Sequence, residues 1–154
     1  MTRAMLMGPV GSGKSTLALA LSGAAAGCGV PAKTQDVQFV GDLIDTPGEY
    51  VEHGHFNHAL MLTSYEADLG VLLESAVEDG PRVAPAFATM FTCPVVGVVT
   101  KIDLAEPDGV QHARKRLDLA AVDHVVEVSA LTGQGLTELR ALLDRLVPAG
   151  SRRS

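Results

Sequence analysis

Gly8-Pro9-Val10-Gly11-Ser12-Gly13-Lys14-Ser15 is the stretch of sequence that decides the fold. It matches the pattern G-x-x-x-x-G-K-S in full, directly after an apolar run at residues 4–7 and at the start of a helical pattern over residues 14–21. Its glycines let successive N–H groups point inward at phosphate oxygens, and the helix N-terminus adds its positive end. The pattern therefore predicts a phosphate-binding loop. A glycine-rich turn with an exposed Lys14 is the structural alternative.

The same loop predicts which residues contact a nucleotide. Lys14 is expected on the β- and γ-phosphates, and Ser15 is expected to ligate Mg²⁺. The predicted nucleotide contacts in this part of the chain are Gly8, Gly11, Ser12, Gly13, Lys14, Ser15 and Thr16.

Short apolar runs alternate with helical periods along the rest of the chain, as in α/β proteins. The predicted strands are residues 4–7, 36–40, 42–45, 69–74, 95–100 and 124–129, and the predicted helices are residues 14–21, 55–65, 110–119 and 136–146. Residues 95–99 form a continuous apolar run, which is typical of a strand covered by helices on both faces. Residues 37–39 alternate, which suits an edge strand. Gly80, Pro81 and Pro85 predict a loop or one short helix in residues 78–92.

Composition indicates one globular domain. The 154 residues are 47% hydrophobic and 19% charged, with a net charge of −6, so we expect one domain at residues 1–149 and a frayed tail at residues 150–154. The acidic balance disfavours an electrostatic nucleic-acid or anionic-membrane binder. Cys28 and Cys93 have no zinc-ligand spacing, and no apolar stretch reaches the length of a membrane span. We therefore expect free thiols in a soluble, cytoplasmic protein.

Asp45-Thr46-Pro47-Gly48 follows the third predicted strand, 31 residues after Lys14. A carboxylate at this place can hold Mg²⁺ through water, while the amide of Gly48 meets the γ-phosphate. The same tetrapeptide also suits a plain turn, because proline and glycine occupy turn-favouring positions.

Thr100-Lys101-Ile102-Asp103 follows the longest buried strand, and Thr100, Lys101 and Asp103 are predicted nucleotide contacts. Asp103 is placed to accept hydrogen bonds from N1–H and the exocyclic N2 of guanine, a donor pair that adenine lacks, and Lys101 is expected to pack its stem along the base. Ser129-Ala130-Leu131, after the last strand, is expected to supply a backbone N–H to guanine O6. A solvated lysine, a capping aspartate and a capping serine are the structural alternatives.

These motifs stand in the order, and at the strand ends, of a translation-factor-type or Ras-type GTPase domain, and the resemblance covers nearly the whole chain. More narrowly, Lys33-Thr34-Gln35, Asp45-Thr46-Pro47-Gly48-Glu49-Tyr50 and His58-Ala59-Leu60 resemble the EutP/PduV family of small P-loop NTPases. Its members belong to ethanolamine- or propanediol-utilisation systems and are associated with bacterial microcompartments.

The resemblance implies a fold, cofactors and partners. The fold is a three-layer α/β P-loop NTPase, a Ras-like G domain with a mostly parallel six-stranded sheet and one antiparallel edge strand. The implied cofactors are Mg²⁺ and GTP or GDP, with ATP as the alternative. Microcompartment shell or enzyme proteins are the implied partners, and no nucleic acid or membrane is expected.

The resemblance also assigns roles near the γ-phosphate. Thr34 becomes the switch I threonine, although it also suits the opening of a strand. The implied metal ligands are Ser15, Thr34 and Asp45, and the implied catalytic residues are Lys14, Thr34, Gly48 and Glu49.

Two positions depart from the common GTPase pattern. Thr100 stands where many GTPases have Asn, and a threonine cannot make the amide contacts that tie the base-binding loop to the phosphate loop. Glu49 stands where Ras-type proteins carry Gln, so it either acts as a base on water or is exposed. Arg82 is the better guess for an arginine finger, but no arginine occupies an evident finger position, which predicts slow hydrolysis.

Three functions remain open. The leading one is a nucleotide-switch GTPase of a utilisation system. The alternatives are an ATP-dependent small-carboxylate (acetate) kinase and a nucleotide-binding scaffold that docks to a microcompartment. His53, His55 and His58 form a further cluster, for which solvated imidazoles are favoured over a metal site.

Overall fold

A computed structural model of the chain describes residues 4–8, 13, 16–17, 38–40, 43–45, 57–77 and 86–146. Within these residues, six strands form one sheet in the order β2-β3-β1-β4-β5-β6. The strands are β1 (Ala4–Met7), β2 (Gln38–Val40), β3 (Leu43–Asp45), β4 (Leu69–Ser75), β5 (Val95–Thr100) and β6 (His124–Glu127).

The pairing of these strands is parallel except at one edge. Strand β1 lies between β3 and β4, and β4–β5 and β5–β6 continue the parallel arrangement. Strand β2 pairs antiparallel with β3 and forms one edge. The predicted mostly parallel sheet with one antiparallel edge strand is thus what the described residues contain.

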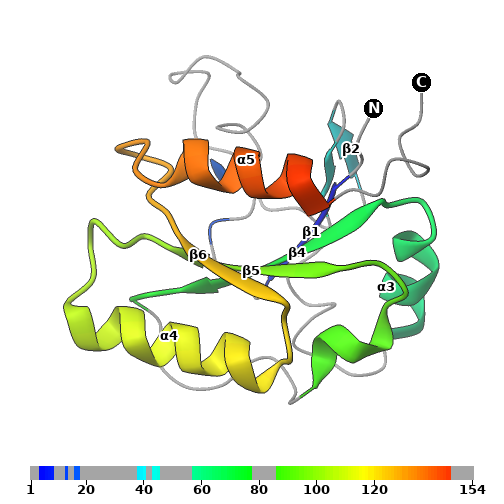
Figure 1. Cartoon of the computed structure of the whole chain (residues 1–154), viewed down its shortest axis with the longest axis horizontal. Coiled ribbons are helices and arrows are strands. Elements are labelled where there is room, and N and C mark those ends of the chain that lie inside the picture. The colour runs from blue at the N-terminus through cyan, green and yellow to red at the C-terminus, as the bar shows by residue number, and fades with distance from the viewer. Residues whose placement is uncertain are drawn as a thin grey trace.

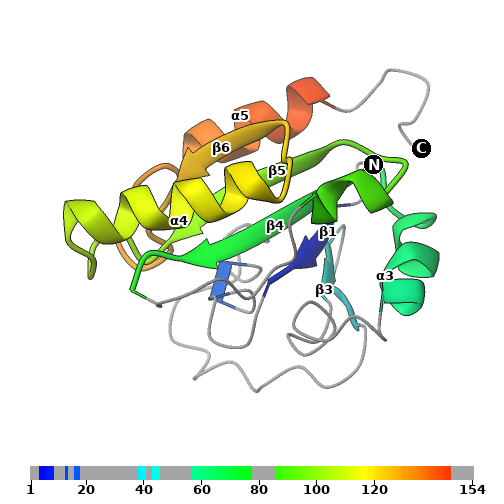
Figure 2. The ribbon, with the colours of Figure 1, turned by 90° about the horizontal axis from the view of Figure 1, so that it is seen from below.

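Helices cover both faces of the sheet, which gives three layers (Figures 1 and 2). Helix α5 (Leu136–Leu146) lies on one face, and α3 (Asn57–Ser64) and α4 (Pro107–Leu119) lie on the other. A short 3₁₀ helix, η2 (Phe87–Met90), lies within the broken segment for which a loop or one short helix was predicted. Thr16 and Leu17 are helical, as predicted, and the rest of that helix lies outside the described residues.

Alternation along the strands divides the core into two clusters, because successive side chains of a strand point to opposite faces. Ala4 and Leu6 of β1 join Leu139 and Leu142 on the α5 face, whereas Met5 and Met7 belong to the cluster on the other face. A parallel sheet buried on both faces requires this division.

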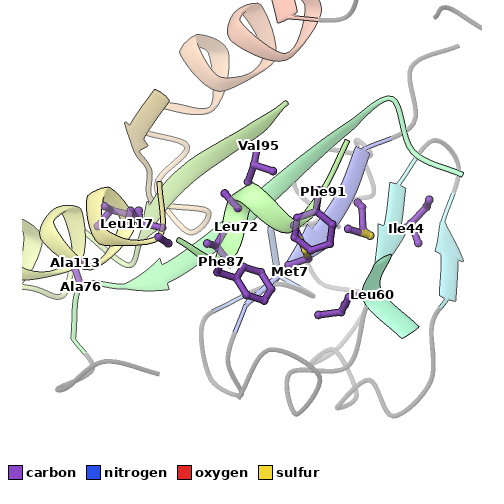
Figure 3. Packing of buried hydrophobic residues seen from close by; sticks show 14 residues of the cluster. Met7, Ile44, Leu60, Leu72, Ala76, Phe87, Phe91, Val95, Ala113 and Leu117 are labelled. Carbon is purple, nitrogen blue, oxygen red and sulfur yellow. The ribbon is translucent and has the colours of Figure 1, made fainter. Parts of the chain in front are cut away.

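Two aromatic rings close the second cluster beside α3. Phe87 and Phe91 stand edge to face, with ring centroids 5.4 Å apart and an interplanar angle of 71°. Figure 3 shows them beside Met7 and Leu72, with Leu60 of α3 nearby. The broken segment after β4 therefore contributes to the core.

Two predicted elements have wrong bounds. Strand β6 ends at Glu127 and not at Ser129, because the N–H and C=O of Ser129 bond to Gln134 and Gly133 instead of a neighbouring strand. Helix α4 begins at Pro107 and not at Val110. Proline is tolerated at the first helical position, because the N–H that it lacks would have no intrahelical partner there.

Smaller differences occur at two other ends. Strand β4 continues one residue further than predicted, to Ser75, which pairs with Thr100. Helix α3 ends at Ser64, one residue before the predicted end, because the N–H groups of Tyr65 and Glu66 bond three residues back. Strands β1 and β5 and helix α5 have the predicted bounds. The predicted starts of β2, β3 and α3, at residues 36–37, 42 and 55–56, lie outside the described residues.

In the part of the chain that the structure describes, the search for a helix long and apolar enough to cross a membrane finds none.

Gly109 allows close contact between α4 and the end of β4. A Cβ at this position would lie 2.3 Å from the backbone oxygen of Ala76, which cannot move without disturbing the sheet. We predict that Gly109→Ala destabilises the protein by about 2 kcal/mol, although alanine is the better helix former by about 1 kcal/mol. Urea unfolding measures the change. Gln111→Ala, at an exposed position of the same helix, is the control and should stay within about 0.5 kcal/mol. An equal or higher stability of Gly109→Ala would contradict the predicted clash.

Candidate functional site

The end of β1 leads into the phosphate-loop motif. Gly8 is buried directly after β1, and Gly13 has a φ of 91°, a left-handed conformation that favours glycine. The N–H of Leu17 donates to the Gly13 oxygen at 2.9 Å, so the first helical turn begins here. Both ends of the predicted loop therefore have the local geometry that a strand–loop–helix motif needs.

The end of β5 leads into a tight turn that carries Asp103. Thr100 is the last residue of the strand, and Lys101 has a φ of 61°, which is uncommon for a residue other than glycine. The N–H of Leu104 donates to the Lys101 oxygen at 3.1 Å and closes the turn. Asp103 is thereby left exposed just beyond the edge of the sheet. Left-handed residues of this kind concentrate at functional sites.

A hydrogen bond between two loops fixes the Asp103 carboxylate. Ser129 is fully buried, and its Oγ donates to Asp103 Oδ1 at 2.7 Å while accepting from the Thr132 N–H at 3.2 Å. The Ser129 N–H donates to the Gln134 oxygen at 2.9 Å, and the Gly133 N–H donates to the Ser129 oxygen at 2.8 Å. Its own backbone hydrogen bonds thus close the loop that follows β6. Through Ser129, this loop holds the Asp103 carboxylate in place.

A pocket of about 170 Å³ lies between these loops. Its lining comes from the helix after β1, the loop after β5 and the loop after β6. The lining residues are Gly13, Thr16, Leu17, Thr100, Lys101, Asp103, Leu104, Ala130 and Leu131. A partly enclosed, mostly apolar pocket with few polar groups is the usual form of a small-molecule site.

Seven of the predicted nucleotide contacts line this pocket together, although they come from three distant parts of the chain: Gly13, Thr16, Thr100, Lys101, Asp103, Ala130 and Leu131. Ser129 joins them through its bond to Asp103. Leu17 and Leu104 also line the pocket and were missed. Leu104 follows Asp103 directly, and Leu17 lies one turn after Gly13, so adjacency to the motifs was the available signal.

Several predicted residues lie outside the described part of the chain: Gly11, Ser12, Lys14, Ser15, Thr34, Gly48, Glu49, Arg82, Cys28, His53 and His55. Asp45 is described through its backbone, which pairs with Leu6 two residues before Gly8. His58 is exposed near the start of α3. The predicted magnesium ligands therefore stay predictions. Among the described residues, no cluster of three His, Cys, Asp or Glu side chains has metal-binding geometry.

Thr100, the position that departs from the common GTPase pattern, is buried between neighbouring strands. Its Oγ1 donates to the Glu74 backbone oxygen over a long 3.4 Å. A Cβ placed on Gly13 would lie 3.7 Å from Thr100 Oγ1 and 3.8 Å from Lys101 Cε. An alanine side chain at Gly13 would therefore be in ordinary van der Waals contact with Thr100 and Lys101, so these two residues lie close to the end of the phosphate-loop motif.

Cys93 lies just before β5 begins, so it is at the opposite end of that strand from the pocket. It is a half-buried free thiol. Burial raises the pKa of the Cys93 thiol, a backbone hydrogen bond lowers it by less, and the charge of Asp68 raises it again. The thiol is neutral at physiological pH and takes no part in the pocket's chemistry.

The fold is that of the P-loop GTPases. The translation elongation factor SelB from Methanococcus maripaludis, in complex with a GTP analogue, matches with a TM-score of 0.67 and 20% identity, over 94% of this chain and 33% of that one. The G domain of the FeoB iron transporter of T. maritima matches with a TM-score of 0.63 and 25% identity, over 96% of this chain and 99% of that one. A GTP-binding protein engB, described as probable, matches with a TM-score of 0.68 at 17% identity.

Sequence comparison narrows this class to one family. The profile "PduV-EutP: Ethanolamine utilisation - propanediol utilisation" matches residues 1–145, so the chain belongs to this family. The "Propanediol utilization protein PduV" of Citrobacter freundii is 35% identical over 94% of both chains. The "Probable acetate kinase EutP" of Salmonella typhimurium is 33% identical over 95% of this chain and 89% of that protein.

The bond between Ser129 and Asp103 has a measurable effect on stability. We predict that Ser129→Ala lowers the free energy of unfolding by about 1–2 kcal/mol, because the buried hydroxyl both donates and accepts a hydrogen bond. Denaturant unfolding measures the loss. Thr137→Ala, on the exposed side of α5, should change stability by less than about 0.5 kcal/mol. Equal effects of the two substitutions would contradict the structural role of Ser129.

Proposed function

We propose that the chain binds a guanine nucleotide in this pocket, hydrolyses GTP slowly and acts as a nucleotide switch in an ethanolamine- or propanediol-utilisation system. One observation carries the proposal. Ser129 Oγ holds Asp103 Oδ1 at 2.7 Å beside a mostly apolar pocket. The hydrogen bond fixes the orientation of a carboxylate at the place where the edge of a purine would lie.

The chemistry of the carboxylate favours guanine. An ionised carboxylate accepts hydrogen bonds and donates none. Guanine presents two adjacent donors, N1–H and the exocyclic N2, whereas adenine presents an acceptor at N1. Asp103 therefore complements guanine and repels the corresponding edge of adenine. Because the Ser129 bond restricts the rotation of the carboxylate, little further entropy is lost when the base binds.

The walls of the pocket suit the faces of a planar base. Leu104 and Leu131 are exposed leucines, at 67% and 82%, and both line the pocket. The stem of Lys101 lies beside Gly13, so its methylene groups offer a further apolar surface while the ammonium stays in water. Base binding would remove these apolar surfaces from water, a favourable contribution.

The phosphates are proposed to extend from the pocket along the loop between Gly8 and Thr16. Lys14 would contact the β- and γ-phosphates, and Ser15, Thr34 and Asp45 would hold Mg²⁺. The support is the sequence motif together with the described ends of the loop, Gly8 and Gly13. When bound, the ion supplies positive charge to the phosphate oxygens.

Hydrolysis is proposed to be slow. Glu49 replaces the water-orienting glutamine of Ras-type proteins, and no arginine occupies an evident finger position, Arg82 being the better guess. A missing arginine finger costs about 10³- to 10⁵-fold in rate, so a turnover below about one per second is expected without a partner.

The proposed setting follows from the family. A switch protein passes on its nucleotide state through loops that order around the γ-phosphate, here Thr34 and the region of Gly48. We place it in the cytoplasm, with microcompartment shell or enzyme proteins as partners, because the family is defined by ethanolamine and propanediol utilisation.

A second candidate is phosphoryl transfer from ATP to acetate. The relatives named "Probable acetate kinase EutP", at 33% and 30% identity, favour testing it. The same phosphate loop positions a γ-phosphoryl group for any nucleophile. Acetyl phosphate formed from ATP and acetate, at a rate above GTP hydrolysis, would favour the kinase over the switch.

Exchanging Asp103 tests the base assignment. We predict that Asp103→Asn weakens GDP binding about 10- to 100-fold, the effect of losing hydrogen bonds to a charged group. The variant should gain affinity for xanthosine diphosphate, because the asparagine amide donates to the O2 of xanthine while its oxygen accepts from N1–H. Competition against a fluorescent guanine nucleotide measures both changes.

Glu106→Gln is the matched control. Glu106 is an exposed acid three residues further on, which precedes α4 and makes no side-chain capping bond. Its substitution should leave both affinities unchanged. Equal binding of GDP by wild type and Asp103→Asn, or a wild-type preference for ATP over GTP, would overturn the proposed guanine site.

A further inference from the structure

A buried ion pair connects α4 to the carboxyl end of β4. Glu74 is only 2% exposed, and its Oε2 accepts from Arg116 Nε at 3.1 Å. Arg116 Nη2 also donates to the Ser75 backbone oxygen at 3.1 Å, so the guanidinium holds both a side chain and the main chain of β4. The Arg116 side chain is 11% exposed. Figure 2 shows α4 lying along β4 and β5, which lets Arg116 reach this strand.

The segment held by Arg116 is the direct neighbour of Thr100. Ser75 pairs with Thr100 in the sheet, and the N–H of Ala76 donates to the Thr100 oxygen at 3.0 Å. Thr100 Oγ1 in turn donates to the Glu74 backbone oxygen. Thr100 is the residue from which Lys101 turns the chain toward Asp103. Residues 74–76 therefore form the surface against which residues 100–103, here called the base loop, are packed.

We propose that Glu74 and Arg116 are positioning residues for the base loop, which they act on through residues 74–76 and Thr100 without touching the ligand. The inference rests on the proposed guanine site. Asp103 can distinguish guanine from other purines only if its carboxylate is held in a fixed place relative to the base. Arg116 fixes the neighbouring strand end by two directed hydrogen bonds.

Stability alone is a weak reason for this ion pair. Removing two charges from water costs so much that a buried pair is often no better than two apolar side chains of similar size. Its directed bonds, however, select one arrangement of the strand end. We therefore expect the pair to fix the position of Thr100 while adding little to the free energy of unfolding.

The chain holds a matched control on the same helix. Arg114 and Glu127 join α4 to β6 with Nη1 and Oε2 at 2.6 Å, but both side chains are 38% exposed. This pair is screened by solvent and has no bond to residues 74–76 among its described contacts. Removing the Arg114–Glu127 pair therefore measures the effect of losing an Arg–Glu pair between α4 and the sheet. It leaves the hydrogen bonds beside Thr100 in place.

The test compares Glu74→Leu/Arg116→Met with Arg114→Met/Glu127→Leu in the full chain. Affinities for GDP, IDP and ADP are measured by competition, and folding is followed by thermal melting. Hypoxanthine lacks the exocyclic amine of guanine, so the ratio of IDP to GDP dissociation constants reports the position of Asp103. We expect this ratio to fall about tenfold in the Glu74/Arg116 variant and to stay unchanged in the control. A merely structural role would weaken all three nucleotides alike.

Two additions keep the test decisive. If the double variant does not fold, Glu74→Gln, which keeps an oxygen acceptor for Arg116, should lower the same ratio about threefold. Hydrogen exchange of the Ala76 amide, which bonds to Thr100, should quicken in the folded variant and not in the control. A folded variant with the wild-type ratio would overturn this inference alone. A wild-type protein without preference for guanine would overturn the proposed function, and this inference with it.

Discussion

Parallel pairing of β1, β4, β5 and β6 is the constraint on which the site depends. Parallel neighbours end at the same edge of the sheet, so the chain leaves Met7, Ser75, Thr100 and Glu127 on one side of the molecule. The phosphate-loop motif, the Asp103 turn and the Ser129 loop follow three of these ends. Segments separated by tens of residues therefore line one pocket. In open α/β sheets, ligands bind in this position.

The sheet brings the loops to one edge, but local bonds set their final arrangement. Gly13, where the first helical turn begins, and Lys101, directly after β5, both have positive φ, which turns the chain sharply at these two points. Ser129 then connects the second loop to the third by donating to Asp103, a contact between residues 26 positions apart. Behind them, Arg116 holds the end of β4 beside Thr100. Two interactions thus support the pocket: the Ser129–Asp103 hydrogen bond at its mouth and the bond from Arg116 to the end of β4 in the core.

Local patterns in the sequence predicted most of the described elements. Apolar runs predicted the bounds of β1 and β5, and leucines at helical spacing over residues 136–146 predicted those of α5, because these signals depend on near neighbours in the chain. Seven of the nucleotide contacts that the motifs predicted line one pocket. The predicted end of β6 was wrong, because the backbone of Ser129 forms hydrogen bonds with Gln134 and Gly133 in the loop that follows. Glu74 and Arg116, 42 residues apart, meet only through the packing of α4 on β4, which no local pattern reveals.

The location of the bound base is the central claim, and amide spectra of ¹⁵N-labelled protein titrated with Mg²⁺ and GDP test it most directly. We predict saturable shifts that are largest at Gly13, Thr16, Lys101, Asp103 and Ala130, which surround the pocket. The amide of Cys93, at the opposite end of β5 from the pocket, should not move. Saturable binding that leaves the pocket amides in place and shifts residues elsewhere would contradict the account.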